Sequence, residues 1–272
     1  MRWTVLVPVK DLGSAKSRLR GALPAVPHQD LVLALVLDTL AAALACPAVA
    51  AVLVVSADEA VAAAARGAGA KVLPDPTTGL NPALDHAAAA AGGGPLAALA
   101  GDLPALRGTD LTATLAAATV RGYVPDRAGT GTTLLAAPAG VPLAPRFGPG
   151  SARAHARSGA VALPAGASLR LDVDTPADLA AAARLGLGAR TGALHHPLAA
   201  RVDLMQGTVA TFDETTHTGT VLLDDGTPVE FAADAFAASG LRLLRMGQRV
   251  RLDRAGDGTI TGLGLITFPG GG

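Results

Sequence analysis

The feature that most constrains the fold is a repeated alternation of short, uninterrupted apolar segments with longer segments of helical periodicity. Residues 3–9, 51–55 and 71–73 are runs of β-forming residues, and segments 30–45 and 58–66 between them have helical character. Strands that are apolar on every residue are buried on both faces, which is typical of a parallel sheet between two helical layers. The first part of the chain is therefore predicted to form a Rossmann-like α/β domain.

The alternation continues as far as residue 190. Further helices are expected at 81–91, 111–119, 151–158 and 176–185, and further strands at 96–100, 133–137 and 169–173. Prolines and glycines punctuate the boundaries between these segments, as they do between real helices and strands. The predicted α/β domain accordingly spans residues 1–190.

The pattern of the chain changes after a predicted linker at 191–200. Five short β segments follow, at 205–212, 218–223, 228–231, 249–253 and 260–266. Asp224, Asp225 and Gly226 form a hairpin-turn signal between two of them. Five short strands in so small a region predict a β-barrel of the OB or cold-shock type over residues 201–272.

Composition excludes several classes of protein. The formal net charge of the 272 residues is zero, so the chain as a whole has no attraction for nucleic acid or anionic membranes. The apolar segment 31–46 contains Asp38 and is shorter than the roughly 20 residues of a membrane span, so it is predicted to be a buried helix. The single cysteine, Cys46, is read as a small core residue and fits a reducing cytoplasm.

A basic loop follows the first predicted strand directly. Lys10, Gly13, Lys16 and Arg18 lie in it, just before a short helix. Ligands of α/β sheets bind beyond the carboxyl ends of the strands, and backbone N–H groups together with three cations suit a triphosphate. The spacing is not that of a P-loop, and a solvated basic loop is the alternative.

Three carboxylates follow other predicted strands. Asp102 comes directly after strand 96–100, and Asp172 and Asp174 lie one residue apart at the end of strand 169–173. Side chains at that spacing on a strand point to the same face, where two carboxylates repel each other unless a cation lies between them. A divalent metal, Mg²⁺, is therefore predicted there, with helix capping by Asp102 or Asp174 as the alternative.

Two glycine-rich loops, 125–133 and 147–153, also contain hydroxyl side chains. Glycines allow backbone N–H groups to approach a phosphate or carboxylate closely, and Ser151 is placed to begin a helix that faces such an anion. Ordinary surface loops are the alternative. His86 and His155 are expected on helix faces, with roles as bases or phosphate ligands left open.

Six segments, taken in order, resemble the CofC/FbiD family, the phospholactate or phosphoenolpyruvate guanylyltransferases of coenzyme F-420 biosynthesis. They are VPVKDLGSAKSRL (7–19), GLNPAL (79–84), GDLPAL (101–106), PDRAGTGTTLL (125–135), FGPGSARAH (147–155) and LDVDTPADL (171–179). The resemblance covers residues 1–190 and implies a MobA-type nucleotidyltransferase fold. It also implies a Mg²⁺-dependent reaction in which a phosphorylated three-carbon acid attacks the α-phosphorus of GTP and pyrophosphate leaves.

The resemblance implies roles for particular residues. The nucleotide would be bound by Lys10, Gly13, Lys16, Arg18, Leu80 and Asn81, the acid by Thr133, Gly148 and Ser151, and the metal by Asp102, Asp172 and Asp174. Lys16, Asp102 and Asp174 would be catalytic. The family also makes a homodimer plausible. The alanine-rich composition favours phosphoenolpyruvate over 2-phospholactate, although no residue separates the two acids.

Three alternatives remain open at this point. One is a nucleotidyltransferase with another base or acceptor, such as a molybdopterin-type enzyme. Another is a metal-dependent glycosyltransferase, because an Asp-x-Asp pair also suits a nucleotide sugar. The third is a nucleic-acid-binding protein that acts through its barrel, which the zero net charge and the scarcity of aromatic residues, 3%, argue against.

Overall fold

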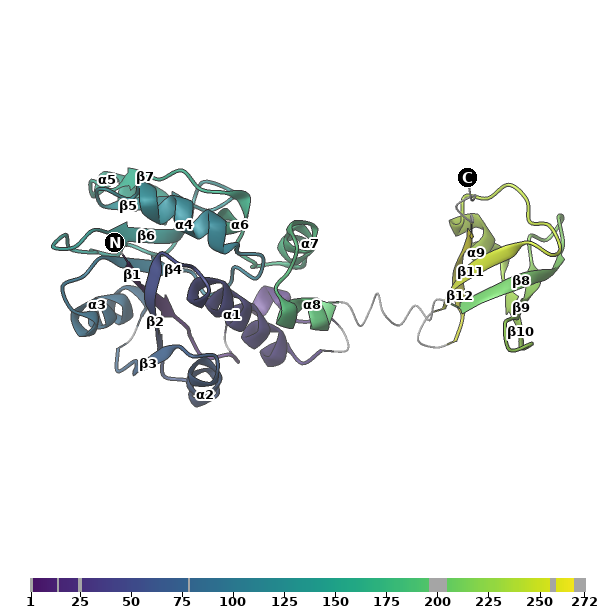
Figure 1. Cartoon of the computed structure of the whole chain (residues 1–272), viewed down its shortest axis with the longest axis horizontal. Helices are drawn as coiled ribbons and strands as arrows, with labels where there is room; N and C mark the ends of the chain where they lie inside the picture. The colour runs from purple at the N-terminus through teal and green to yellow at the C-terminus, as the bar shows by residue number, and fades with distance from the viewer. Residues whose placement is uncertain are drawn as a thin grey trace. The chain divides into compact units, whose positions relative to one another are not determined.

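The computed structural model describes residues 2–13, 15–23, 26–77, 79–195, 205–254 and 258–266. The chain divides into two compact units, Met1–Leu194 and His195–Gly272 (Figure 1). Within the described ranges, every helix is too short or too polar to cross a lipid bilayer.

The first unit is built on a seven-stranded sheet with the strand order β3-β2-β1-β4-β6-β5-β7 (Figure 1). The strands are β1 Trp3–Pro8, β2 Val49–Ser56, β3 Lys71–Pro74, β4 Leu96–Leu99, β5 Gly122–Pro125, β6 Thr132–Ala137 and β7 Val161–Ala162. Strands β1 to β4 are parallel, but β6 runs antiparallel to both β4 and β5. The expected all-parallel sheet is therefore mixed, because a short loop joins β5 to β6 and a parallel pair would need a long crossover.

Helices cover both faces of this sheet, as the sequence predicts. They are α1 His28–Leu44, α2 Glu59–Gly67, α3 Leu80–Ala91, α4 Gly108–Ala117, α5 Ser151–Arg157, α6 Ala167–Arg170, α7 Pro176–Leu185 and α8 Ala189–His195, with a 3-10 turn, η1, at Ser17–Leu19. Helices α1, α2 and α4 pack in one cluster with one face of the sheet, and α3 packs against the other face. The two helical layers leave the loops at the strand ends accessible.

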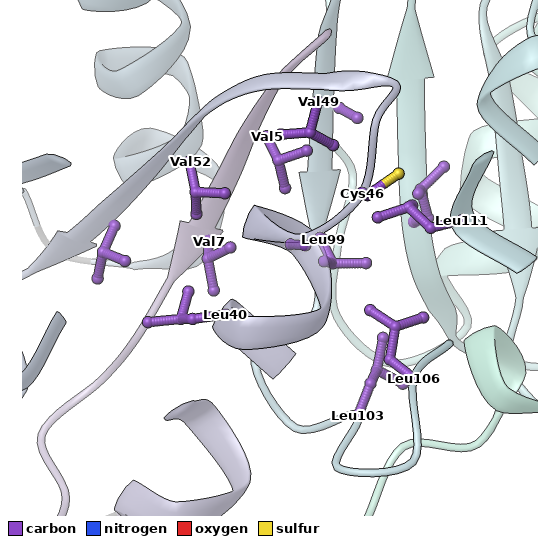
Figure 2. Close-up of a cluster of buried hydrophobic side chains, with 14 of the residues drawn as sticks. Val5, Val7, Leu40, Cys46, Val49, Val52, Leu99, Leu103, Leu106 and Leu111 are labelled. Atoms are coloured by element: carbon purple, nitrogen blue, oxygen red, sulfur yellow. The ribbon is translucent and has the colours of Figure 1, made fainter. Parts of the chain in front are cut away.

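Figure 2 shows the core on the α1 face of the sheet. Val5 and Val7 of β1 and Val52 of β2 meet Leu40 of α1, all of them buried. Cys46 lies in the same cluster and is 2% exposed, so it is a core residue. Aliphatic side chains supply the packing that larger aromatic side chains supply in other cores, which agrees with the low aromatic content.

Two sequence expectations in this unit are wrong. The predicted strand 169–173 is instead the end of helix α6 followed by an extended segment outside the sheet. Leu171 and Val173 are buried there against α1 and α7, so their alternation reflects packing and not a strand ladder. The predicted linker 191–200 begins within helix α8, whose second and third residues, Arg190 and Thr191, donate their amides to the carboxylate of Asp38. Residues 196–200 lie outside the described residues.

The second unit is a five-stranded antiparallel sheet with the order β10-β9-β8-β11-β12. Its elements are β8 Met205–Phe212, β9 Gly219–Leu223, β10 Pro228–Phe231, α9 Ala233–Ala238, β11 Arg249–Arg254 and β12 Ile260–Leu265. All five predicted strands are present, whereas helix α9 was not predicted. A ladder between β10 and β12, which would close the sheet, is absent from the described ranges, so the barrel stays a prediction.

Candidate active site

The candidate site lies at one edge of the mixed sheet. Parallel strands β1 and β4 end at this edge, and antiparallel β6 begins there, with Leu99 paired to Leu134. The Ala100 amide donates to the Thr133 carbonyl at 2.8 Å, which fixes the end of β4 beside the start of β6. The loops after β1 and β4 and before β6 therefore converge around a pocket of about 960 Å³.

Most of the predicted site residues line this pocket. They are Lys10, Lys16, Arg18, Leu80, Asp102, Gly148, Ser151, Asp172 and Asp174. Residues that the sequence analysis did not single out also line it, namely Asp126, Thr130, Gly131, Thr132 and Phe147. Gly13, Asn81 and Thr133 are not among the lining residues, and the structure gives them other positions.

The charged centre of the pocket is an ion-pair cluster around Lys16. Its ammonium donates hydrogen bonds to the carboxylates of Asp102 and Asp174, which come from segments far apart in the sequence. The Val173 amide donates to the Asp102 carbonyl at 3.0 Å and so holds the two carboxylate segments together. Burial favours a lower pKa for Lys16, but the charge of Asp102 and the hydrogen bonds to both carboxylates outweigh it and raise the pKa. Lys16 is therefore a charged ammonium.

Asp172 lies beside this cluster. Burial first, and the negative charge of Asp102 second, raise the pKa of Asp172 to about 7. No group of three or more His, Cys, Asp or Glu side chains among the described residues is placed to share a metal ion. Mg²⁺ is commonly held by one or two carboxylates together with substrate phosphates, so these oxygen donors suit it without a preformed cage. Metal binding by Asp102, Asp172 and Asp174 stays a prediction.

The two helix-capping alternatives do not describe these aspartates. Thr175 caps helix α7 by accepting from the Asp178 amide, within a capping box, so Asp174 is left to pair with Lys16. Asp102 precedes α4 by several residues, and the N-cap of that helix is Arg107. Both carboxylates are therefore directed to the pocket and not to helix ends.

The loop that carries Lys16 is held from outside the pocket. The Leu12 amide donates to Asp58 at 3.0 Å, and a ring nitrogen of His28 lies 2.8 Å from the Ala15 carbonyl. The hydrogen bond from Leu12 is the largest cause of a lowered pKa of Asp58, and it outweighs the opposite effect of burial. Asp58 also caps helix α2, and its contact with Leu12 joins that cap to the loop. The carbonyl of Gly13 accepts from Arg20, so Gly13 shapes this loop.

The second glycine-rich loop is anchored by Asn81. Its side-chain amide donates to the Phe147 carbonyl at 3.0 Å, and its carbonyl oxygen accepts from the Phe147 amide at 2.7 Å. Gly148 and Gly150 follow with φ angles of 132° and 71°, a region that side chains with a Cβ rarely occupy. The amide of Asn81 is thus occupied in fixing the loop that presents Gly148 and Ser151 to the pocket.

The first glycine-rich loop is shaped by Asp126. Its two carboxylate oxygens accept from the Thr130 and Gly131 amides at 2.9 and 2.8 Å. The Ala152 amide then donates to the Thr130 carbonyl at 3.2 Å and joins this loop to the start of α5. The two glycine-rich loops therefore form one connected surface.

Thr133 and Thr132 have different roles in that surface. The Thr133 side chain is buried and donates to the Leu169 carbonyl at 2.6 Å, so it ties β6 to α6 and does not face the pocket. Thr132 does line the pocket, with its hydroxyl oxygen 3.0 Å from Nδ1 of His155. His155, expected on a helix face, is on the inner face of α5 and is 0% exposed. Burial first, and the charges of Arg121 and Arg146 second, lower the pKa of His155 to about 4.

Comparison with known proteins identifies relatives of the first unit. The model of the family described as "Guanylyl transferase CofC like" matches residues 3–191. A "Phosphoenolpyruvate guanylyltransferase" of Salinispora arenicola is 63% identical over 198 residues, which are 71% of this chain and 92% of that protein. A protein of the same name from Geodermatophilus obscurus is 55% identical over 201 residues, 71% of this chain and 93% of that protein.

A solved structure supports the fold. A nucleotidyl transferase from Methanothermobacter thermautotroptrophicus superposes with a TM-score of 0.52 at 22% sequence identity, covering 68% of this chain and 97% of that one. At this identity the likeness concerns the fold alone. It confirms the expected α/β nucleotidyltransferase architecture of the unit that contains the pocket.

Proposed function

Because the chain belongs to the guanylyl transferase CofC-like family, we propose that it transfers GMP from GTP to phosphoenolpyruvate, with release of pyrophosphate, in coenzyme F-420 biosynthesis. The two relatives named phosphoenolpyruvate guanylyltransferase match it at 63% and 55% identity over nearly their whole length. The observation that carries the proposal within the structure is the Lys16–Asp102–Asp174 cluster at the sheet edge, which lines one pocket together with the two glycine-rich loops.

The proposed reaction needs charge neutralisation and alignment more than acid–base chemistry. A phosphate oxygen of the acid, already ionised at neutral pH, attacks the α-phosphorus of GTP. The bond from that phosphorus to the bridging oxygen of the β-phosphate breaks, and pyrophosphate leaves with the electron pair. Side chains that hold the reactants in line and offset their charge supply most of such catalysis. Lys16, with Lys10 and Arg18 on the same lining, supplies the positive charge.

A divalent metal fits the opposite charge in this pocket. Asp102, Asp172 and Asp174 would hold Mg²⁺ together with phosphate oxygens of the nucleotide. When bound, the ion would neutralise the leaving pyrophosphate. Asp172 makes no ion pair with a cationic side chain in the described ranges, so its carboxylate is available as an oxygen donor.

The glycine-rich side of the pocket is proposed to bind the acid. Gly148, Ser151 and Thr132 line it, and within the described ranges no carboxylate hydrogen-bonds to these three residues, whereas Asp126 bonds to the neighbouring Thr130 and Gly131 amides. Thr133 supports this side from behind through its bond to Leu169. Leu80 lines the pocket at the start of α3 and is proposed to lie near the nucleoside, with Asn81 holding the adjoining loop. Both substrates are cytoplasmic metabolites, so we place the reaction in the cytoplasm; a homodimer stays a prediction.

The experiment that tests the proposal is pyrophosphate release by the full chain with GTP and Mg²⁺. Phosphoenolpyruvate, 2-phospholactate and 3-phosphoglycerate are offered in turn, and ATP replaces GTP in a parallel series. A coupled assay with the next enzyme of the pathway traps a labile product. We expect release with GTP and phosphoenolpyruvate. Release with no pair, from folded protein that binds Mg²⁺, contradicts the proposal, and release with a different base or acid redirects it.

A further inference from the structure

We propose that His155 is a positioning residue for the acceptor acid, because it turns the hydroxyl hydrogen of Thr132 towards the pocket, where that hydrogen bonds an anionic oxygen of the acid. The inference rests on the proposed function and adds to it the role of His155 and the direction of the Thr132 hydroxyl. Neither residue was assigned a role in substrate binding by the sequence analysis. Three hydrogen-bonding groups lie in a row, the Arg146 amide, the His155 ring and the Thr132 hydroxyl.

The first step fixes the tautomer of the imidazole. The backbone N–H of Arg146 donates to Nε2 of His155 at 2.9 Å. A backbone amide is only a donor, so Nε2 must offer a lone pair and carries no hydrogen. In a neutral imidazole the single ring hydrogen is then on Nδ1.

The second step fixes the direction of the next hydrogen bond. Nδ1 of His155 lies 3.0 Å from the hydroxyl oxygen of Thr132. Since Nδ1 carries the hydrogen, it donates and Thr132 accepts. The hydroxyl hydrogen of Thr132 is then free to donate elsewhere, and the structure shows no other partner for this hydroxyl in the described ranges.

The third step places the Thr132 hydroxyl at the pocket. Thr132 lines it next to Thr130 and Gly131, and the Lys16 cluster lines the same pocket. A donor aimed at a fixed point favours an oxygen with negative charge, and hydrogen bonds to charged groups are stronger than those between neutral ones. The carboxylate or phosphate of the acid offers such an oxygen.

The surroundings of His155 keep it neutral and fixed. Its ring is fully buried, packs edge-on against Phe147 with centroids 5.1 Å apart, and lies 6.0 Å from the ring of Tyr123. The charged groups that face it are Arg121 and Arg146, which together with burial lower the pKa of His155 to about 4. A protonated ring would have a hydrogen on Nε2 and would oppose the Arg146 amide, so the arrangement requires the neutral form.

The kinetic test uses the full chain with Thr132→Val, Thr132→Ser, His155→Phe and the double variant Thr132→Val/His155→Phe. We expect Thr132→Val to raise the KM for phosphoenolpyruvate about 10-fold, the loss of one hydrogen bond to a charged group, and to leave the KM for GTP within about 2-fold. Thr132→Ser, which keeps the hydroxyl, should stay near the wild-type value. His155→Phe should raise the same KM in the wild type and add nothing once Thr132 is valine.

Thr119→Val and His86→Phe are the matched controls, since Thr119 is exposed in the turn that follows α4 and His86 lies on α3 outside the pocket lining. If the two substitutions instead multiply in the double variant, His155 acts on the fold and not through Thr132, and the inference is overturned. It is overturned equally if Thr132→Val leaves the KM for the acid unchanged.

A second measurement does not depend on turnover. ¹⁵N NMR of the histidine rings in the wild type is expected to show one neutral ring protonated on Nδ1 at pH 7, assigned by its disappearance in His155→Gln. A His155 ring that is protonated on Nε2 overturns the inference. If the wild type releases no pyrophosphate with any acid, the proposed reaction has failed. Calorimetric titration of phosphoenolpyruvate into wild type and Thr132→Val then decides the role of the hydroxyl, with equal affinities counting against it.

Discussion

The pocket has two walls that hold their ligand-facing groups in different ways. We call Lys10, Lys16, Arg18, Asp102, Asp172 and Asp174 the charged wall, and Thr130, Gly131, Thr132, Gly148, Gly150 and Ser151 the neutral wall. In the charged wall the functional side chains hold one another, since the ammonium of Lys16 contacts Asp102 and Asp174 directly. In the neutral wall, side chains hold the loop backbone. Asp126 does so from within the lining, and Asn81 and the buried His155 do so from outside it.

This difference separates the expected effects of substitution. A change in the charged wall removes a group that meets the reacting phosphates, so it should lower kcat. A change in the supports of the neutral wall loosens a surface that binds the acid, so it should raise the KM for the acid and spare the chemical step. The following predictions test that division.

The largest effect is expected from Lys16→Met, which removes the central cation of the charged wall. Loss of one preorganised charge that stabilises a transition state commonly lowers kcat by about 100- to 1000-fold. The measurement is pyrophosphate release at saturating GTP and phosphoenolpyruvate. Lys71→Met is the matched control, because Lys71 is exposed and is the first residue of β3. The pocket lies at the other, carboxyl end of the parallel strands. A fall of less than about 10-fold in kcat would show that Lys16 mainly serves the fold.

An intermediate effect is expected from Asn81→Ala in the supports of the neutral wall. It removes both hydrogen bonds to Phe147, at 3.0 and 2.7 Å, and leaves two backbone groups unpaired. Their combined cost is about 2 kcal/mol, which we expect mainly as a KM for phosphoenolpyruvate raised about 30-fold. Gln206→Ala, at an exposed position of β8, is the control. If kcat falls as far in Asn81→Ala as in Lys16→Met, the expected difference in effect between the two walls is contradicted.

A smaller effect is expected from acid. The folded-state pKa of His155, about 4, lies below the usual value of 6.5, so the unfolded chain binds a proton first as pH falls. The stability that the neutral ring contributes is complete above about pH 6.5 and is lost progressively towards pH 4, by at most about 3 kcal/mol. Urea unfolding at several pH values measures this loss. His155→Phe should flatten the pH dependence of the free energy of unfolding between those pH values. An unchanged slope would mean that other groups cause the loss of stability.

The charged wall could be predicted from the sequence because its signals are local. Lys16, Asp102 and Asp174 each follow an apolar segment. The carboxyl ends of parallel strands lie at the same edge of a sheet, so residues that follow them meet there. Even so, one premise was wrong, since Asp172 and Asp174 lie on an extended segment and not on a strand. Burial of the flanking Leu171 and Val173 produced the same alternation that a strand has.

The neutral wall could be predicted only in part. Its glycines were visible in the sequence, and Gly148 and Ser151 do line the pocket. The choice between Thr132 and Thr133 was not visible, because adjacent residues on a strand face opposite sides and the register of β6 depends on its unexpected antiparallel pairing with β4. The supports Asn81 and His155 act across the fold, and no local spacing reveals such contacts.

The smallest effect is expected from removing the second unit. Both walls and all of their supports lie within Met1–Leu194, and the family match ends at residue 191. A chain that ends at residue 195 keeps helix α8 and its bonds to Asp38, so kcat and both KM values should stay within about 2-fold of the full chain. Pyrophosphate release by the two chains, at equal concentrations of folded protein, measures this. A loss above about 10-fold in kcat/KM would mean that the second unit completes the pocket, and a third wall would have to be added to the two described here.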